Sequence, residues 1–296
     1  SKGNGSKYDL NDRSKFSITL DLKNDESINE LKKLIGQVDA VFEGFRPGVM
    51  EKLGLGPNDL LSINEKLVYG RMTGWGQEGV FSDMAGHDLN YLSITGALNA
   101  IGRKDERPPV PLNLIADYGG GGMLLAVGML SALIHSQKTG KGQVVDAAMI
   151  DGTSMLMSLF YSFYGSGVWA NERESNLLDG AAHFYDTYEC KDGKYIAVAC
   201  IEDKFYKEML DKLEITDEKF SKQFSKDIWP ELKSKLGEKF LSKNRDEWAM
   251  IFKNSDACIT PILDLDEAPK HEHNKSRSTF TAVSYTHLTL PTTTPV

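Results

Sequence analysis

The chain has 296 residues, of which 41% are hydrophobic and 26% are charged, and its formal net charge is −8. This composition is typical of a globular protein with a large core and room for a second domain. The acidic balance argues against nucleic acid as the main partner, because phosphate binding requires a basic face. No apolar run is expected to reach the length of a membrane span. The three cysteines lack metal-ligand spacing, so they predict a reducing compartment and no metal site.

Strand-like and helix-like patterns alternate over the first quarter of the chain. Strands are predicted at 16–22 and 38–45, a third strand with its loop at 67–76, and helices at 25–35, 49–53 and 59–64. This alternation predicts a parallel, right-handed α/β layer. In such sheets the loops that follow the strands carry the ligand, which directs attention to Gly44–Arg46 and Arg71–Gly76.

The stretch from Ala85 to Leu133 has the strongest pattern of a reactive site. His87 lies in GHDLNY, and Asp117 in ADYGGGG precedes a long apolar helix that is predicted to start near Tyr118. Free N–H groups in the glycine-rich first turn, and those near Asp117, would suit an oxygen that gains negative charge. On the residues alone, a loop histidine and a helix N-cap are the plainer readings of His87 and Asp117.

The second half changes character after another strand (144–150) and an apolar helix (151–169). A hairpin is predicted over 184–201 with its turn at Asp192-Gly193, followed by helices at 204–213, 230–241 and 245–254. The expected division is a large α/β domain (1–150), a linker helix region (151–183), a small α+β domain (184–269) and a return linker and tail (270–296). The closing VSYTHLTLPTTTPV lacks a core pattern and is interpreted as either a cloning or read-assembly remnant or a flexible natural tail.

Several strings together resemble the class III CoA-transferase family, and within it the members that act as racemases. They are FEGFRPGVMEKLGLGP, YGRMTGWGQEG, AGHDLNYLSITGAL, ADYGGGG, TGKGQVVDAAMIDG and YDTYECKDGKYIAVACIE, and the match runs from about Tyr8 to Phe280. The resemblance implies an α/β fold with a large Rossmann-like parallel-sheet domain and a smaller α+β domain, in an interlocked homodimer with shared active sites. The family's opening strand–helix unit is expected to be missing, and its closing segment to be replaced by the unusual tail.

The resemblance also implies site residues. His87 and Asp117 match the catalytic acid–base pair, and Glu202 in ACIED matches a carboxylate that supports the histidine. The positions that match CoA contacts are Gly44, Phe45, Arg46, Lys52, Gly86, Asp88, Leu89, Asn90 and Tyr91. Read without the resemblance, Glu202 is ordinary first-turn helix charge, and Arg46 and Lys52 are ordinary surface charges.

The implied reaction is inversion at C2 of 2-methyl-branched acyl-CoA thioesters by 1,1-proton transfer through an enolate. CoA is part of the substrate, so no cofactor is expected, and the implied partners are acyl-CoA and a second copy of the chain. One alternative is a CoA transferase in which Asp117 carries the acyl group, although transferases of the family typically lack histidine at the position of His87. Another alternative is an inactive, truncated CoA-binding chain. The expected location is a mitochondrial or peroxisomal matrix or a bacterial cytoplasm.

Overall fold

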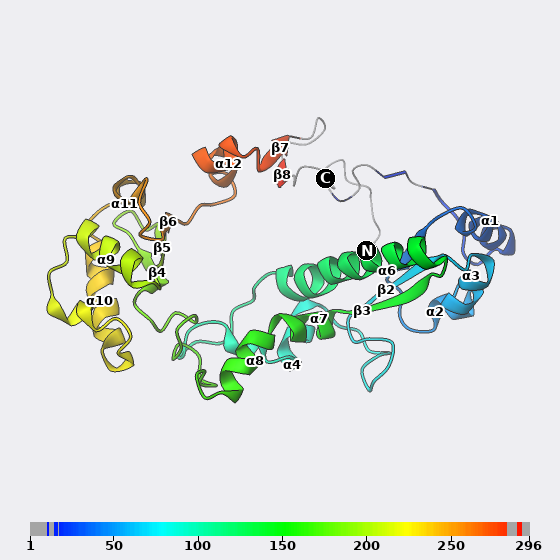
Figure 1. Cartoon of the computed structure of the whole chain (residues 1–296), viewed down its shortest axis with the longest axis horizontal. Helices are drawn as coiled ribbons and strands as arrows, with labels where there is room; N and C mark the ends of the chain where they lie inside the picture. Colours follow the sequence, from blue (N-terminus) through cyan, green and yellow to red (C-terminus); the bar gives the residue numbers. More distant parts are fainter. Residues whose placement is uncertain (1–10, 12–14, 17, 283–288, 292–296) are drawn as a thin grey trace. The chain divides into compact units, whose positions relative to one another are not determined.

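The computed structural model describes residues 11, 15–16, 18–282 and 289–291. The chain divides into two compact units (Figure 1). One unit is Leu20–Ala182, and the other is His183–Val296 together with Ser1–Thr19. Residues 151–182, for which the sequence predicts a linker, belong to the same unit as the parallel sheet.

The first unit contains a three-stranded parallel sheet. Its strands are β1 (Ala40–Glu43), β2 (Val68–Thr73) and β3 (Gln143–Ala148), in the order β1-β2-β3. The predicted α/β class with a parallel sheet is therefore confirmed. All three strands run in one direction, so their carboxyl ends meet at one edge of the sheet.

Helices precede, join and follow these strands. They are α1 (Asp25–Ile35), α2 (Val49–Lys52), α3 (Pro57–Ile63), α4 (Asp88–Ile94), α5 (Ala97–Ala100), a π-helix (Leu114–Met123), α6 (Leu124–Thr139), α7 (Met149–Leu156) and α8 (Ser158–Gly165). Asn24 caps α1: its side chain accepts a hydrogen bond from the Glu26 N–H at 2.8 Å. The single helix predicted at 151–169 is instead two helices that meet at Met157, where ψ is −2°.

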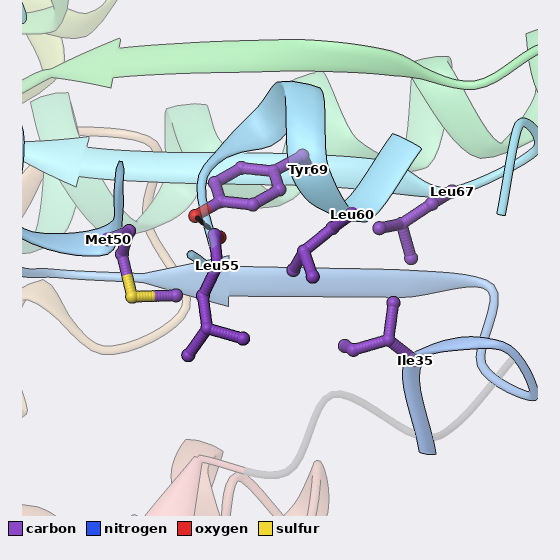
Figure 2. Packing of buried hydrophobic residues seen from close by; sticks show 6 residues of the cluster. All are labelled: Ile35, Met50, Leu55, Leu60, Leu67 and Tyr69. Carbon is purple, nitrogen blue, oxygen red and sulfur yellow. Dashed lines mark hydrogen bonds between the residues drawn. The ribbon is translucent and has the colours of Figure 1, made fainter. Parts of the chain in front are cut away.

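One apolar cluster fills the space between β1, β2 and the first three helices (Figure 2). Each fully buried aliphatic side chain contributes about 1.5–3 kcal/mol of transfer free energy. Inside the cluster the Tyr69 hydroxyl donates to the Leu55 carbonyl at 3.0 Å, so this buried polar atom is satisfied. The buried members are Ile35, Met50, Leu55, Leu60, Leu67 and Tyr69.

The strand predicted at 16–22 is absent from the residues of that stretch that the structure describes. The side chains of Phe16 and Ile18 are exposed, and no described strand pairs with this segment. A β-rich run becomes a strand only when a neighbour completes its hydrogen bonds, which the local pattern does not reveal.

The predicted start of the long helix near Tyr118 is wrong. The helical segment begins at Leu114 as a π-helix and passes directly into α6. The combined segment, Leu114–Thr139, has a mean hydropathy of 1.4 and is long and apolar enough to cross a membrane, so the expectation about apolar runs is also wrong. In this fold α6 packs on β2 and β3, and Leu125, Ala132 and Ser136 are its buried residues.

The π-helix and α7 approach each other through glycine. A Cβ on Gly152 would lie 1.8 Å from the Gly120 carbonyl oxygen, and a Cβ on Gly120 would lie 2.7 Å from the Thr153 nitrogen. No side chain fits at those separations, so the two backbones are in direct contact. The glycine run in ADYGGGG therefore serves helix packing.

The second unit is built on an antiparallel sheet. The predicted hairpin is confirmed as β4 (Tyr185–Glu189) and β5 (Tyr195–Ala199), with Gly193 in its turn at φ +74°, and β6 (Ile259–Pro261) joins β5 as an unpredicted third strand. The three predicted helices are present as α9 (Asp203–Lys212), α10 (Trp229–Phe240) and α11 (Arg245–Phe252). Farther along are α12 (Glu272–Ser276), β7 (Phe280–Ala282) and β8 (Thr289–Pro291), and short 3₁₀ turns lie at Glu218–Ser221, Lys226–Ile228 and Ala268–Lys270. β8, in the unusual tail, pairs with β7, and the rest of that tail lies outside the described residues.

A buried histidine sits at the start of this unit. The His183 ring is fully buried, and its Nε2 lies 2.7 Å from the Tyr206 hydroxyl, while Nδ1 has no hydrogen-bond partner in the described part of the chain. Burial lowers the pKa of His183 to about 4.

We expect the stability of the second unit to fall as the pH is lowered from about 6.5 to 4. In that window His183 becomes protonated in the unfolded protein but stays neutral in the folded protein. This difference lowers the unfolding free energy by about 3 kcal/mol at pH 4. Urea unfolding at a series of pH values measures this slope. His183→Gln should flatten it, and an equal slope in the variant would contradict the assignment.

Gly152→Ala should lower the unfolding free energy of the first unit by about 3 kcal/mol, because its Cβ would overlap the Gly120 carbonyl. Gly165→Ala in α8 is the matched control, since a Cβ there meets nothing within 4 Å. Equal denaturation midpoints for the two variants would show that the helix crossing is looser than described.

Candidate functional site

A cavity of about 310 Å³ lies at the carboxyl ends of β1 and β2. The prediction that the loops after these strands form a binding site is therefore supported by a hollow in the expected place. The residues that line it are Gly44, Phe45, Arg46, Pro47, Met72, Thr73, Gly74, Trp75, Ser82, Met84, Ala85, Gly86, His87, Tyr91 and Met149.

The loop after β1 supplies one wall. Glu43 ends the strand with its side chain buried, and its Oε2 accepts a hydrogen bond from the Phe45 N–H at 2.7 Å. This bond turns the chain so that Phe45 and Arg46 face the cavity, where both side chains remain exposed. An exposed arginine at a loop of this kind is suited to phosphate oxygens.

The loop after β2 leaves room for an aromatic ring. A Cβ on Gly74 would lie 2.0 Å from the Tyr91 ring, and a Cβ on Gly86 would lie 2.8 Å from it. Tyr91 also meets Trp75 edge to face, with ring centroids 4.8 Å apart. The two glycines therefore place Tyr91 at the wall of the cavity.

His87 lies at this wall, immediately before α4. Its backbone N–H donates to the Asn90 side chain at 3.1 Å, which is half of a capping arrangement, and its side chain is exposed. The imidazole is thus left open to a ligand in the cavity.

Asp88 ties the histidine segment to the helix that carries Asp117. Its carboxylate is buried, and its Oδ2 accepts the backbone N–H groups of Ala116 at 2.8 Å and of Asp117 at 2.9 Å. The half-buried Asp117 side chain accepts from the Asn113 amide at 3.3 Å. The pKa of Tyr91 is raised by burial and by the negative charge of Asp117.

The predicted use of the Asp117 backbone as an oxygen-binding group is not supported. The Asp117 N–H already donates to Asp88, and Asp117 lies inside a helix that begins three residues earlier. It is therefore not the N-cap of that helix. Gly120 and Gly121 are buried in the same helix, so the glycine turn is not an open helix end.

The cavity is positive or neutral along its described lining. Its ionisable side chains are Arg46, His87 and Tyr91, and no carboxylate is among its described lining residues. The buried Trp75 Nε1 has no hydrogen-bond partner among the described residues, so a donor remains for a ligand acceptor. Such a lining favours an anionic ligand with an apolar portion.

The structure places the remaining predicted residues elsewhere. Lys52 ends α2, and Leu89 and Asn90 lie on α4 without lining the cavity. Glu202 belongs to the second unit, where its carbonyl accepts the N–H groups that start α9 and its side chain is exposed.

Three methionines line the cavity: Met72, Met84 and Met149. Met72 falls within the loop region identified from the sheet pattern. Met84 comes from the loop before α4, and nothing in the local sequence points to it.

A second cavity, of about 380 Å³, opens among α5, the π-helix, α7 and α8. Its lining is mainly apolar and includes Ile115, Leu156, Met157, Phe160 and Trp169. Within the described residues, no group of three or more His, Cys, Asp or Glu side chains is arranged to hold a metal ion.

The family model described as CoA-transferase family III matches residues 1–296. The chain belongs to CoA-transferase family III. It is 45% identical over 268 residues to the alpha-methylacyl-CoA racemase of Mus musculus, covering 90% of this chain and 70% of the mouse protein. It is 44% identical over 278 residues to the Homo sapiens protein of the same name, covering 93% and 73%.

Solved structures of CoA-transferase family III relatives agree with the fold. The crystal structure of Rv3272 from Mycobacterium tuberculosis superposes with a TM-score of 0.76 at 25% identity, covering 96% of this chain and 75% of that one. The family to which this chain is similar thus includes proteins named as racemases and as acyl-CoA transferases.

Asp88→Ala should lower the unfolding free energy by about 3 kcal/mol, because two buried backbone N–H groups lose their acceptor. Asp88→Asn keeps one acceptor oxygen and should lose less than half of that amount. Urea denaturation of both variants gives the comparison. An equal loss of unfolding free energy in the two variants would contradict this explanation, because it would show that the charge of Asp88 and not its hydrogen bonds is what stabilises the protein.

Proposed function

We propose that this protein inverts the configuration at C2 of 2-methyl-branched acyl-CoA thioesters. The observation that carries the proposal is the exposed His87 side chain at the wall of the cavity, in a chain about 45% identical to two alpha-methylacyl-CoA racemases. The link from the neighbouring Asp88 to Asp117 supports a two-residue site, since it joins the segments that carry both candidate groups.

The chemistry needs one group on each face of the reacting carbon. A thioester acidifies its α C–H only in part, so a base must remove the proton as the enolate forms. His87 removes the C2 proton from one face, and protonated Asp117 donates a proton to the other face, which inverts the centre. In the reverse direction Asp117 is the base and protonated His87 is the acid. Glu202 is proposed to support the imidazolium.

CoA is proposed to bind along the loop after β1. Arg46 and Lys52 provide positive charge for its phosphates, and Gly44 and Gly86 allow close approach of the backbone. The remaining candidates for CoA binding are Phe45 and the segment Asp88–Tyr91. The apolar cavity beside α7 and α8 is proposed to accept the acyl chain, since it offers aliphatic and aromatic walls.

A homodimer is part of this proposal. Four apolar side chains in and just before α6 are exposed, and their spacing places them on one face of the helix. A second copy of the chain would cover this apolar stripe. The stripe consists of Met123, Val127, Leu130 and Ile134, each more than half exposed. The three cysteines are free thiols, which suits an intracellular compartment.

Proton NMR of one enantiomer of a 2-methylacyl-CoA in heavy water tests the reaction. We expect loss of the C2 proton signal together with formation of the other epimer. His87→Ala and Asp117→Asn should each lower kcat by about 100-fold or more. His135→Ala, at an exposed position on α6, should leave kcat unchanged and is the matched control.

Two outcomes would contradict the racemase proposal. Transfer of the acyl group's CoA to an added free acid, without exchange at C2, would favour a transferase in which Asp117 carries the acyl group. Neither exchange nor transfer, in a protein that unfolds cooperatively, would favour a CoA-binding chain without activity.

A further inference from the structure

A buried arginine lies directly behind the loop that follows β1. Arg71 is in β2, where its register partner on β1 is Glu43, and it is only 8% exposed. It does not line the cavity. It therefore cannot act on a ligand there except through other residues.

The Arg71 guanidinium bonds to carboxylates on both sides of the loop. Its Nε lies 3.2 Å from Glu43 Oε1, at the end of β1. Its Nη1 and Nη2 lie 2.7 and 3.2 Å from the two oxygens of Glu51, in α2. The bonds to Arg71 lower the pKa of Glu51, so the pair is charged at neutral pH.

Glu43 connects Arg71 to the wall of the cavity. Its second oxygen accepts the Phe45 N–H at 2.7 Å, so a chain of bonds runs from Arg71 through Glu43 to the backbone of the cavity loop. At the other end of the loop, Gly48 at φ +78° leads into α2, which carries Glu51. One guanidinium thus holds both ends of the segment 44–48.

The charges explain why arginine is needed at this place. Without Arg71, the buried Glu43 carboxylate would stand uncompensated just behind a loop that is proposed to meet phosphates. A lysine places one point charge there, and it cannot bond through a planar fork to one carboxylate while it also bonds to another.

We propose that Arg71, with Glu43 and Glu51, is a positioning group that fixes the CoA-binding loop, and that its role lies in ligand binding. This inference rests on the proposed function, because it takes CoA as the ligand of that loop. A fixed loop lowers the conformational cost of binding, so loosening it raises Kd and KM while the proton-transfer step at saturation is unaffected.

Titration calorimetry with free CoA is the test, run on the whole chain with the NMR assay beside it. Glu51→Gln should raise the Kd of CoA about fivefold and Arg71→Lys about tenfold, with KM rising in parallel and kcat within about twofold. Glu51 is half exposed, so Glu51→Gln is expected to fold even where a change at Arg71 does not.

The matched control is another arginine–glutamate fork, in the second unit. Arg245 binds Glu267 through two bonds of 2.6 and 2.9 Å, and Glu267→Gln should leave the Kd of CoA unchanged. An unchanged Kd in both Glu51→Gln and Arg71→Lys, beside normal wild-type binding, would overturn this inference alone. A wild-type protein that binds no CoA would overturn the proposed function and this inference with it.

Discussion

The carboxylate of Asp88 is the interaction on which the candidate site depends. It accepts two backbone N–H groups from a segment 28 and 29 residues farther along the chain, and it directly follows His87. A buried carboxylate with such donors is costly to displace, since both N–H groups would lose their partner. The backbone of the segment that carries Asp117 is thereby held beside the segment that carries His87.

Three acidic side chains near the cavity bond to other parts of the protein. Glu43 and Glu51 bond to Arg71, and Asp88 bonds to backbone amides. In this acidic chain, that arrangement leaves Arg46 and His87 as the charged or titratable basic groups along the cavity lining. The cavity lining therefore carries basic groups in a chain whose net charge is negative.

Local patterns were sufficient where the deciding interactions are local. The hairpin turn at Gly193 and the alternation that builds the parallel sheet are both visible in short windows of sequence. The helix start at Leu114 was missed because Asp88, far away in sequence, completes its hydrogen bonds. Met84 was missed as a cavity residue because only the course of the loop between β2 and α4 brings it there. The roles of His87, Asp117 and Glu202 remain predictions from the family resemblance.

The π-helical stretch before α6 has a consequence for how this region tolerates change in length. A π turn contains one residue more than an α turn, so Leu114–Met123 stores extra backbone in a continuous helix. Deleting a single residue after Asp117 in this stretch would turn one π turn into an α turn, so the helix on both sides would keep its phase. The same deletion within the α-helical part that follows would rotate everything upstream by about 100° around the helix axis.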